Sequence, residues 1–336
     1  MTQTAVGFLG MGYYVPEKVL TNFDLEKMVD TSDAWIVERT GIRERHIAAP
    51  EQATSDLAFI AAQRALDDAG VKPEDIDLIV LGTASPDMAF PSTACLLQDR
   101  LGCTHAAAFD LSAGCSGFVY ACGIASQSIA TGLYKHVLVV GAETLSRILN
   151  WKDRNTCILF GDGAGAAVLG PVEEGYGILS IDMGADGSGG KYLDQPAGGS
   201  RRPASHETVD AVEHTIHMVG REVFKFAVRT MPKSVLTALN KVGLDQSAID
   251  LLIPHQANLR IIDSASKRLK VPMEKIFVNL DKYANTSSGS IPIALCQARD
   301  EGRIHKGDNV VMVGFGAGLT YATLVVKWQK DEVKKA

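Results

Sequence analysis

The sequence predicts an α/β fold built from two related halves, and two observations support this. Helical and strand patterns alternate along the 336 residues, which is typical of α/β proteins. Three pairs of segments also recur at one constant offset in the numbering: ALDDAG (65–70) with ALNKVG (238–243), IDLIV (76–80) with IDLLI (249–253), and HVLVVGA (136–142) with NVVMVGF (309–315). This repeat offset indicates a duplicated unit. We therefore expect an N-terminal half at residues 1–175 and a C-terminal half at residues 176–336.

Each half predicts the order helix, strand, helix, strand, helix, strand. The strands are rich in Val, Ile and Leu without clean alternation, as expected for strands covered on both faces. The repeat loses register in the middle, where Asp110-Leu111 best matches Asn279-Leu280 at a slightly shorter offset. Between residues 184 and 208, the abundance of Gly, Pro, Ser and charged residues predicts a long surface loop. Loops of that length in compact proteins are often functional.

Composition excludes several classes of protein. A net charge of −6 argues against a general nucleic-acid binder, which normally carries a basic surplus. No apolar run approaches the roughly 20 residues of a membrane helix, and the start lacks the basic and apolar regions of a secretory signal. The six cysteines show neither CxxC nor zinc-type spacing. We therefore expect a cytoplasmic protein with reduced thiols, no metal, no nucleic-acid partner and no membrane association.

Cys115 is the candidate nucleophile. The segment DLSAGCSGFVYACGIA (110–125) ends a strand and opens a helix, with a glycine close to the cysteine on either side. A thiol at a helix N-terminus meets the positive end of the helix dipole, so we expect a lowered pKa and a favoured thiolate. A thiolate is what nucleophilic acyl transfer requires. The remaining cysteines are interpreted as small buried hydrophobic residues: Cys95, Cys103, Cys122, Cys157 and Cys296.

The second half supplies polar groups for the same cleft. His255 follows the strand of LLIPHQANLRII (251–262), and the carboxyl ends of strands in α/β folds are where ligands gather. Asn285 lies shortly before Ser288, which takes the place of Cys115 at the repeat offset. An isolated Asn is most often a turn residue, and the duplication is what makes Asn285 interesting. The segment VMVGFGAGLTYATLVV (311–326) predicts a strand, a glycine turn and a second strand. That turn is either a plain hairpin or a donor of backbone N–H groups to an oxyanion.

Four motifs together resemble the 3-oxoacyl-[acyl-carrier-protein] synthase III family: AGCSGF at Cys115, PHQANLRII at His255, ANTSSGSIP at Asn285, and GFGAGLT. ERTGIRERHIA (38–48), GTASPDMAFPSTAC (82–95) and REVFKFAV (221–228) match the family too. The resemblance covers nearly the whole chain in order. It implies a thiolase-like fold, a duplicated five-layer αβαβα arrangement.

The resemblance also implies an activity. The family carries out a decarboxylating condensation of a short acyl-CoA primer with malonyl-acyl-carrier protein, which gives a 3-oxoacyl-carrier protein and initiates fatty acid synthesis. No cofactor is implied, because acyl-CoA is a substrate. Cys115 would take the acyl group, His255 and Asn285 would stabilise the enolate, and the N–H groups of Cys115 and Ala317 would form the oxyanion hole.

The resemblance further assigns binding residues. Coenzyme A contacts are implied at Trp35, Arg39, Arg154 and Asn258. The acyl pocket is implied at Phe160 and at Phe90, which the partner subunit of a homodimer would insert. Contacts with the carrier protein are implied at Gln256, Ala257, Asn258, Leu259, Arg260, Lys225 and Lys267. For Lys225 and Lys267 an ordinary solvated surface is the alternative interpretation.

Two departures from the family pattern, and three other functions, stay open. Ala317 stands in GFGAG where many relatives have GFGGG, and Ala284 stands where Gly often precedes the Asn, so the acyl preference is left open. One alternative is a related condensing or acyl-transfer enzyme of secondary metabolism. A Cys–His–Asn hydrolase also fits the order of the three residues, although AGCSG lacks the papain signature. The last alternative is a non-catalytic interaction protein, against which the presence of all three residue types argues.

Overall fold

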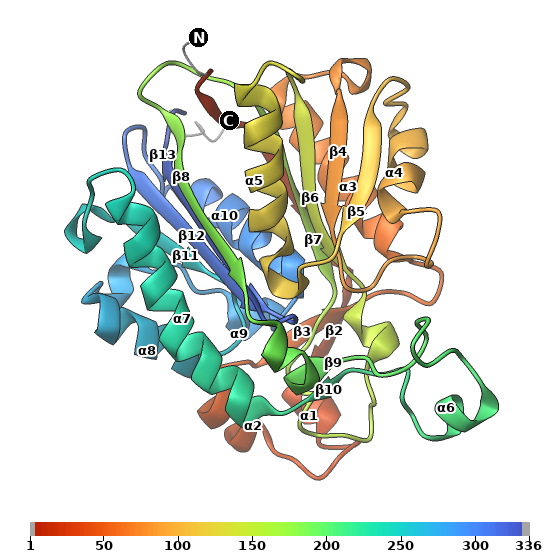
Figure 1. Ribbon diagram of the computed structural model, residues 1–336. Coiled ribbons are helices and arrows are strands. Elements are labelled where there is room, and N and C mark those ends of the chain that lie inside the picture. Colours follow the sequence, from red (N-terminus) through yellow and green to blue (C-terminus); the bar gives the residue numbers. More distant parts are fainter. Residues whose placement is uncertain (1–3, 331–336) are drawn as a thin grey trace.

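The computed structural model, which describes residues 4–330, has five layers (Figure 1). Two helices cover the outer face of a first sheet, two helices lie between this sheet and a second one, and two helices cover the outer face of the second sheet. In that order the helices are α3 (Thr54–Ala69) and α4 (Thr93–Leu101), α5 (Gly117–Ala130) and α10 (Ser290–Asp300), and α7 (Gly220–Asn240) and α8 (Leu259–Leu269). The expected αβαβα arrangement is confirmed.

The two sheets have the same strand order. The first runs β1-β7-β6-β4-β5 and the second β8-β13-β12-β11. The strands of the first sheet are β1 (Val6–Tyr14), β4 (Leu78–Gly82), β5 (Ala107–Leu111), β6 (Val137–Glu143) and β7 (Gly163–Pro171). Those of the second are β8 (Gly177–Ala185), β11 (Leu251–Pro254), β12 (Asn309–Gly316) and β13 (Thr320–Lys327). In the first sheet β4 pairs in parallel with β6. In the second sheet the equivalent strands of the internal repeat, β11 and β12, also pair in parallel.

One expected strand is almost absent from the second half. The counterpart of β5 is a single parallel bridge between Leu252 and Ile276, so the prediction of a full strand there is wrong. Phe277 still donates its N–H to Leu252, but the N–H of Asn279 bonds the side chain of Gln256 instead of a strand. The chain then enters α9 (Leu280–Tyr283), which accounts for the lost register of the repeat.

Smaller elements line the lower part of the molecule in Figure 1. They are β2 (Lys18–Thr21), β3 (Glu44–Ile47), β9 (Leu193–Asp194), β10 (His217–Met218), α1 (Asn22–Leu25), α2 (Asp33–Thr40) and α6 (His206–Asp210). The predicted loop at 184–208 contains a 3-10 turn at 187–192 and β9, which pairs with β10. The segment around α6 extends away from the sheets.

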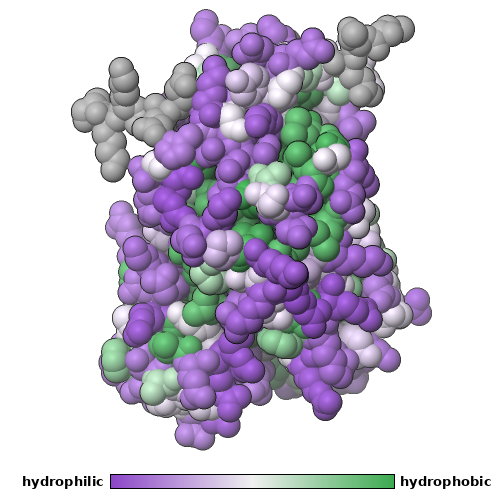
Figure 2. Space-filling view, turned by 90° about the vertical axis from the view of Figure 1, so that its left-hand side faces the viewer, coloured by the Kyte–Doolittle hydropathy of each residue, from purple (hydrophilic) through white to green (hydrophobic). Residues whose placement is uncertain are grey.

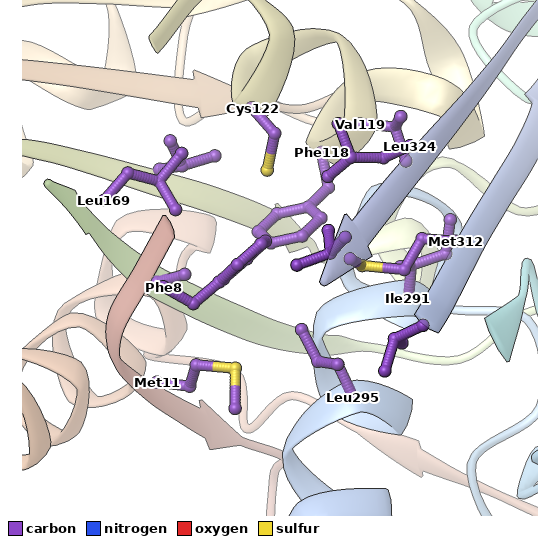
Figure 3. Close-up of a cluster of buried hydrophobic side chains, with 14 of the residues drawn as sticks. Phe8, Met11, Phe118, Val119, Cys122, Leu169, Ile291, Leu295, Met312 and Leu324 are labelled. Atoms are coloured by element: carbon purple, nitrogen blue, oxygen red, sulfur yellow. The ribbon is translucent and has the colours of Figure 1, made fainter. Parts of the chain in front are cut away.

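The central layer holds one apolar core shared by both halves. Phe8, Phe118 and Leu169 from the first half meet Met312 and Leu324 from the second (Figure 3), and all five are fully buried. Burial of each such side chain contributes roughly 1.5–3 kcal/mol. The two halves therefore share one hydrophobic core and pack as a single unit.

Glycines let the two central helices approach the first sheet closely. Each helix is preceded by a 3-10 turn, η2 (Gly114–Ser116) before α5 and η7 (Ser287–Gly289) before α10. A Cβ at Gly82 would lie 2.7 Å from the backbone of Gly117, and a Cβ at Gly141 would clash with the backbone oxygen of Ser288. The start of α5 therefore lies directly against the end of β4, and η7 lies directly against β6.

The surface is mixed in character. The side of the molecule formed by β8, α7 and α8 is mostly hydrophilic, with smaller hydrophobic areas, chiefly in its upper half (Figure 2). Within residues 4–330, no helix combines the length and the apolar character needed to cross a bilayer.

Candidate active site

Cys115 lies where two pockets meet. Residues Cys115, Phe160 and Leu193 line both. The inner pocket is largely apolar and is also lined by Ala84, Gly114, Leu145, Ile148, Asp194, Gln195, Ile216, Ser287 and Ala317. The outer pocket is also lined by Leu159, Met218, Gly220, Val223, Phe224, His255, Ala257, Asn258, Ile261, Asn285, Phe315 and Gly316. The structure thus brings Cys115, His255 and Asn285 together in the lining of the outer pocket. The two pockets together are called the tunnel.

Enclosure dominates the electrostatics of Cys115. Its residue is 7% exposed, and burial raises the pKa of the thiol to about 12, with a further increase from the charge of Glu143. A hydrogen bond with Ser287 and the cysteine's own N–H act in the opposite direction. The predicted lowering of this pKa is therefore wrong, because the thiolate loses more solvation by burial than the helix N-terminus returns.

His255 is held as a neutral ring. It is 1% exposed, and burial lowers its pKa to about 3. Its Nδ1 lies 2.6 Å from Oγ of Ser290, and its ring meets Phe315 edge-on at 5.3 Å between centroids. With the Ser290 hydroxyl donating to Nδ1, the ring hydrogen lies on Nε2. His255 can then donate a hydrogen bond to a ligand oxygen in the outer pocket.

Asn285 is fixed at the junction of the halves. Its N–H donates to Leu159, its C=O accepts from Gly161, and it forms a parallel bridge with Phe160. Its Oδ1 accepts the N–H of Ser287 at 2.8 Å, so the amide presents Nδ2 as a donor. The preceding Ala284 has φ 54°, a conformation that favours glycine.

The geometry around Ala317 suits an oxyanion hole. A Cβ at Gly114 would lie 2.6 Å from the backbone N of Ala317, and a Cβ at Gly316 would clash with the backbone N of Cys115. The two N–H groups therefore lie close together, and both residues line the inner pocket. Ala317 is not among the described residues with positive φ, so alanine meets no backbone penalty there.

The predicted coenzyme A residues form a cluster near the outer pocket. The guanidinium carbons of Arg39 and Arg154 lie 4.6 and 5.2 Å from the ring centroid of Trp35. Asn258 lines the outer pocket, accepts the N–H of Arg260 as the N-cap of α8, and donates to the C=O of Arg39. The structure therefore connects the Trp35 cluster to the tunnel entrance.

The predicted carrier-protein residues divide into two groups. Leu259, Arg260, Lys225 and Lys267 are exposed, and Ala257 and Asn258 are half-buried. Lys225 pairs with Glu222 at 2.7 Å and Lys267 with Asp263 at 2.6 Å, which leaves Arg260 as the strongest candidate for an acidic partner.

The assignment of Gln256 to the carrier surface is wrong. The residue is 1% exposed. Its amide donates to the carbonyls of Pro254 and Phe277 and accepts from Asn279. Gln256 stands in a motif next to exposed residues, so the sequence does not reveal that its side chain points inward. There the side chain hydrogen-bonds the backbone of neighbouring segments.

The two predicted acyl-pocket residues lie apart in one chain. Phe160 is buried and lines both pockets. Phe90 is 85% exposed and lines neither, so any role in an acyl pocket requires a second copy of the chain.

Sequence reasoning missed Glu143, Ser287 and Ser290. Glu143 is fully buried at the end of β6, and burial raises its pKa while hydrogen bonds oppose the increase. The available signal was a carboxylate at the end of the apolar run HVLVVGAE.

All six cysteines are free, and residues 4–330 contain no group of three His, Cys, Asp or Glu side chains arranged to hold a metal ion.

Comparisons with known proteins agree with this arrangement. The family model for 3-oxoacyl-[acyl-carrier-protein (ACP)] synthase III matches residues 109–187, and the model for its C-terminal part matches residues 239–328. A beta-ketoacyl-[acyl-carrier-protein] synthase III of Caldanaerobacter subterraneus subsp. tengcongensis is 63% identical over 326 residues, which is 97% of this chain and 98% of the relative.

Solved structures show the same likeness. The 3-oxoacyl-[acyl-carrier-protein] synthase III of Aquifex aeolicus VF5 superposes with a TM-score of 0.89 at 47% identity, covering 96% of this chain and 100% of that one. The priming beta-ketosynthase of the R1128 polyketide biosynthetic pathway gives a TM-score of 0.91 at 36% identity and covers 98% of each chain.

The buried neutral His255 predicts a loss of stability in mild acid. Its pKa falls from 6.5 in the unfolded chain to about 3 in the folded one, so below pH 6.5 only the unfolded state takes up the proton. Between pH 6.5 and 5 the free energy of unfolding should fall by about 2 kcal/mol more in the wild type than in His255→Asn. Denaturant unfolding at both pH values measures this, and exposed His206→Asn controls for the substitution. Equal pH dependence in wild type and His255→Asn would contradict the neutral ring.

Proposed function

Because this chain belongs to the 3-oxoacyl-[acyl-carrier-protein] synthase III family, we propose that its tunnel joins a short acyl group from acyl-CoA to the malonyl group of malonyl-acyl-carrier protein. The enzyme is an acyltransferase of the condensing type that initiates fatty acid synthesis. The observation that carries the residue assignment is that one tunnel is lined by Cys115, His255 and Asn285. A thiol, an imidazole and a carboxamide suffice for both half-reactions.

In the first half-reaction Cys115 is the nucleophile. Its sulfur attacks the thioester carbonyl of acyl-CoA, and coenzyme A leaves as its thiol after taking a proton. The N–H groups of Cys115 and Ala317 donate to the oxyanion that forms on the acyl carbonyl. The acyl chain then occupies the apolar inner pocket beside Phe160. Exclusion of water from this pocket protects the acyl-enzyme from hydrolysis.

In the second half-reaction His255 and Asn285 bind the malonyl thioester oxygen. Nε2–H of the neutral imidazole and Nδ2–H of the amide donate to this oxygen, and both bonds strengthen as loss of CO₂ turns the thioester into an enolate. The enolate carbon attacks the acyl-Cys115 carbonyl, which releases the sulfur and gives the 3-oxoacyl thioester. The low pKa of His255 suits this role, because a neutral ring donates without acting as a cationic acid.

Substrate entry is proposed at the outer pocket. The cluster of Trp35, Arg39 and Arg154 offers an aromatic face and two cations for the nucleotide part of coenzyme A. Asn258 and Ala257 line the passage from the surface to Cys115. The exposed Arg260 beside this entrance offers a positive charge to an acidic carrier protein, and Leu259, Lys225 and Lys267 extend the same surface.

The proposal includes a cytoplasmic homodimer that needs no cofactor. The edge of the first sheet supports a dimer, because β5 pairs on one side only and exposes Phe109 by 38%. An exposed strand edge with apolar side chains is a template for pairing with a second chain. Phe90 could then reach the inner pocket of the partner. We assign the two halves to residues 1–175 and 176–336, of which 1–3 and 331–336 lie outside the described residues.

The secondary-metabolism alternative is the one that keeps support. The likeness to the R1128 priming beta-ketosynthase at 36% identity favours it, whereas 63% identity over nearly the full chain to a beta-ketoacyl-[acyl-carrier-protein] synthase III favours fatty acid synthesis. The chemistry at Cys115 is the same in both cases, so the products formed with different acceptors separate them.

Acyl loading tests the central assignment. Purified protein with acetyl-CoA should form acyl-Cys115, and addition of malonyl-acyl-carrier protein should release CO₂ and a 3-oxoacyl product. Cys115→Ala should lower condensation on the order of 10³-fold or more because the nucleophile is lost. Cys95→Ala, at an exposed cysteine, should keep the activity. Mass spectrometry of protein and product measures both steps, and thioester or peptide hydrolysis without condensation would sink the proposal in favour of a hydrolase.

Reversal of charge at Arg260 tests the carrier surface. Arg260→Glu should lower kcat/KM for malonyl-acyl-carrier protein about tenfold, because the loss acts on association with an acidic partner. Acyl loading from acetyl-CoA should change less than about twofold. Lys135→Glu makes the same charge change at an exposed site outside the tunnel and serves as the control. Equal losses in both half-reactions would show that Arg260 does not recognise the carrier protein.

A charge on the edge strand tests the dimer. The wild type should sediment at twice the chain mass, and Phe109→Asp should sediment as a monomer because a carboxylate would be desolvated at the paired edge. Phe23→Asp changes another exposed phenylalanine, 62% exposed on α1, and should stay dimeric. A monomeric wild type at micromolar concentration would refute this part of the proposal.

A further inference from the structure

Gln256 is a buried amide side chain that the proposed mechanism does not use. Its Nε2 donates to the C=O of Pro254 at 2.7 Å and to the C=O of Phe277 at 3.1 Å. Its Oε1 accepts the N–H of Asn279 at 3.0 Å. These partners fix the orientation of the amide, because two carbonyls need donors and one N–H needs an acceptor. All three partners are backbone groups.

The same backbone groups would bond one another in a continuous parallel strand pair. Successive residues of β11 face opposite neighbours: the N–H of His255 donates to β12, whereas the C=O of Leu252 accepts the N–H of Phe277 on the other side. By this alternation Pro254 faces the same side as Leu252. In a continuous pair the N–H of residue 254 would donate to Phe277, and its C=O would accept from Asn279.

Proline interrupts this pattern, because Pro254 has no N–H. Gln256 supplies the missing donor to the C=O of Phe277. It also stands between the C=O of Pro254 and the N–H of Asn279, and it bonds each of them in place of the other. The side-chain amide therefore takes the position of an inserted peptide group. It holds the segment at 277–279 away from the end of β11.

The first half shows the same strand end without the inserted amide. At the repeat offset Pro254 corresponds to Leu81, and its N–H is present there. Gln256 corresponds to Thr83. In this half β4 and β5 stay paired as far as Leu111, and the N–H of Thr83 donates to the C=O of Leu111. The strand end is thus closed in the first half and separated by a carboxamide in the second.

The separated segment leads directly to Asn285. Asn279 begins α9, since its C=O accepts the N–H groups of Lys282 and Tyr283. The helix has only four residues, and Asn285 lies two residues beyond its end. Gln256 therefore anchors the start of α9, while the backbone bonds of Asn285 anchor the other end. A short helix held at both ends leaves Asn285 little freedom to move independently of Asn279.

The backbone of Gln256 is held together with His255. The two residues are neighbours in the chain, and the N–H of Gln256 donates to Oγ of Ser290 at 3.5 Å. The same Oγ lies 2.6 Å from Nδ1 of His255. Gln256 is thus bonded on one side to the groups that hold His255 and on the other side to the segment that leads to Asn285.

We propose that Gln256 is a positioning residue that sets the separation between His255 and Asn285, the two donors to the malonyl thioester oxygen. The inference rests on the proposed function, since it takes these residues as the donors to the enolate. Two donors stabilise one oxygen only if both reach it at once, and a misplacement of about 1 Å can lower a rate on the order of 10²-fold. The oxyanion hole at Cys115 is built from η2 and the turn after β12, so acyl loading should not depend on Gln256.

Separate measurement of the two half-reactions tests this role. Gln256→Met keeps the length of the side chain and removes its hydrogen bonds. With pre-acylated enzyme, the maximal rate of CO₂ release from malonyl-acyl-carrier protein should fall roughly 10²-fold. The concentration of carrier protein at half the maximal rate should change less than about twofold, and so should single-turnover loading of acetyl-CoA.

Two further variants calibrate this loss. Gln256→Glu should lower CO₂ release only about tenfold, because an acid among carbonyl oxygens stays protonated and keeps one donor and one acceptor. Gln329→Met removes another half-buried amide, which donates to the C=O of Phe8 at 2.6 Å. It should leave both half-reactions unchanged.

A double variant separates positioning from stability. Gln256→Met alone should lower the midpoint of denaturant unfolding, because the C=O of Phe277 loses its donor. Addition of Pro254→Ala supplies a backbone N–H and lets the strand pair close as in the first half, so the midpoint should return toward the wild-type value. CO₂ release should stay as slow as in Gln256→Met, because the closed pair does not restore the separation of the two donors.

Three outcomes would overturn the proposal: equal losses in the two half-reactions, wild-type CO₂ release in Gln256→Met, or recovery of CO₂ release together with the midpoint in the double variant. If Gln256→Met does not unfold cooperatively, Gln256→Glu and the double variant decide the question. A wild type that neither acylates Cys115 nor releases CO₂ would instead refute the proposed function.

Discussion

The structure depends on the close contact of the start of α5 and of η7 with the ends of two strands. The first residue of α5 lies against β4, and η7 lies against β6, because Gly82 and Gly141 present no side chain there. A methyl group at either position would separate the central helices from the first sheet, and overpacking of this kind typically costs about 1–3 kcal/mol. The contact also sets function, because it is what brings the thiol of η2 within reach of groups that the second half supplies.

The same contact excludes water, and the exclusion decides the charges. Burial raises the pKa of Cys115 to about 12 and lowers that of His255 to about 3. Both groups are therefore neutral in the folded protein at pH 7. The neutral state of His255 suits its proposed role, because a neutral donor can stabilise an enolate. The neutral state of Cys115 opposes its proposed role, because the nucleophilic form is the thiolate.

The duplication, the α/β class and the position of Cys115, His255 and Asn285 in one pocket could be predicted from the sequence because they are carried by local patterns. The segments 76–80 and 249–253 repeat, and Cys115, His255 and Asn285 each follow a strand or precede a helix. Each pattern is set by neighbours in the chain, which is why reading along the sequence finds it.

Features that depend on neighbours distant in the chain could not be predicted. The direction of the Cys115 pKa depends on complete enclosure by both halves, and the inward position of Gln256 depends on the carbonyl of Phe277. Glu143 looks like the polar end of a strand until the second half places Ser288 beside it. The strand expected near Ile276 fails for the same reason, since a side chain takes the place of a backbone partner at Asn279.

Divergence between the two halves explains why a symmetric frame has one proposed nucleophile. Three pairs of positions related by the repeat offset carry different residues: Gly82 and His255, Cys115 and Ser288, Glu143 and Gly316. The sheet registers agree with this correspondence, since Gly82 pairs with Gly141 and His255 donates its N–H to Val313 beside Gly314. The imidazole stands where the first half has a glycine, and the carboxylate stands where the second half has one. At each of these two pairs of positions, the half that carries the side chain fills its side of the junction. The half that carries the glycine leaves its side open. A single tunnel therefore reaches Cys115 and not Ser288, which is fully buried beside the carboxylate.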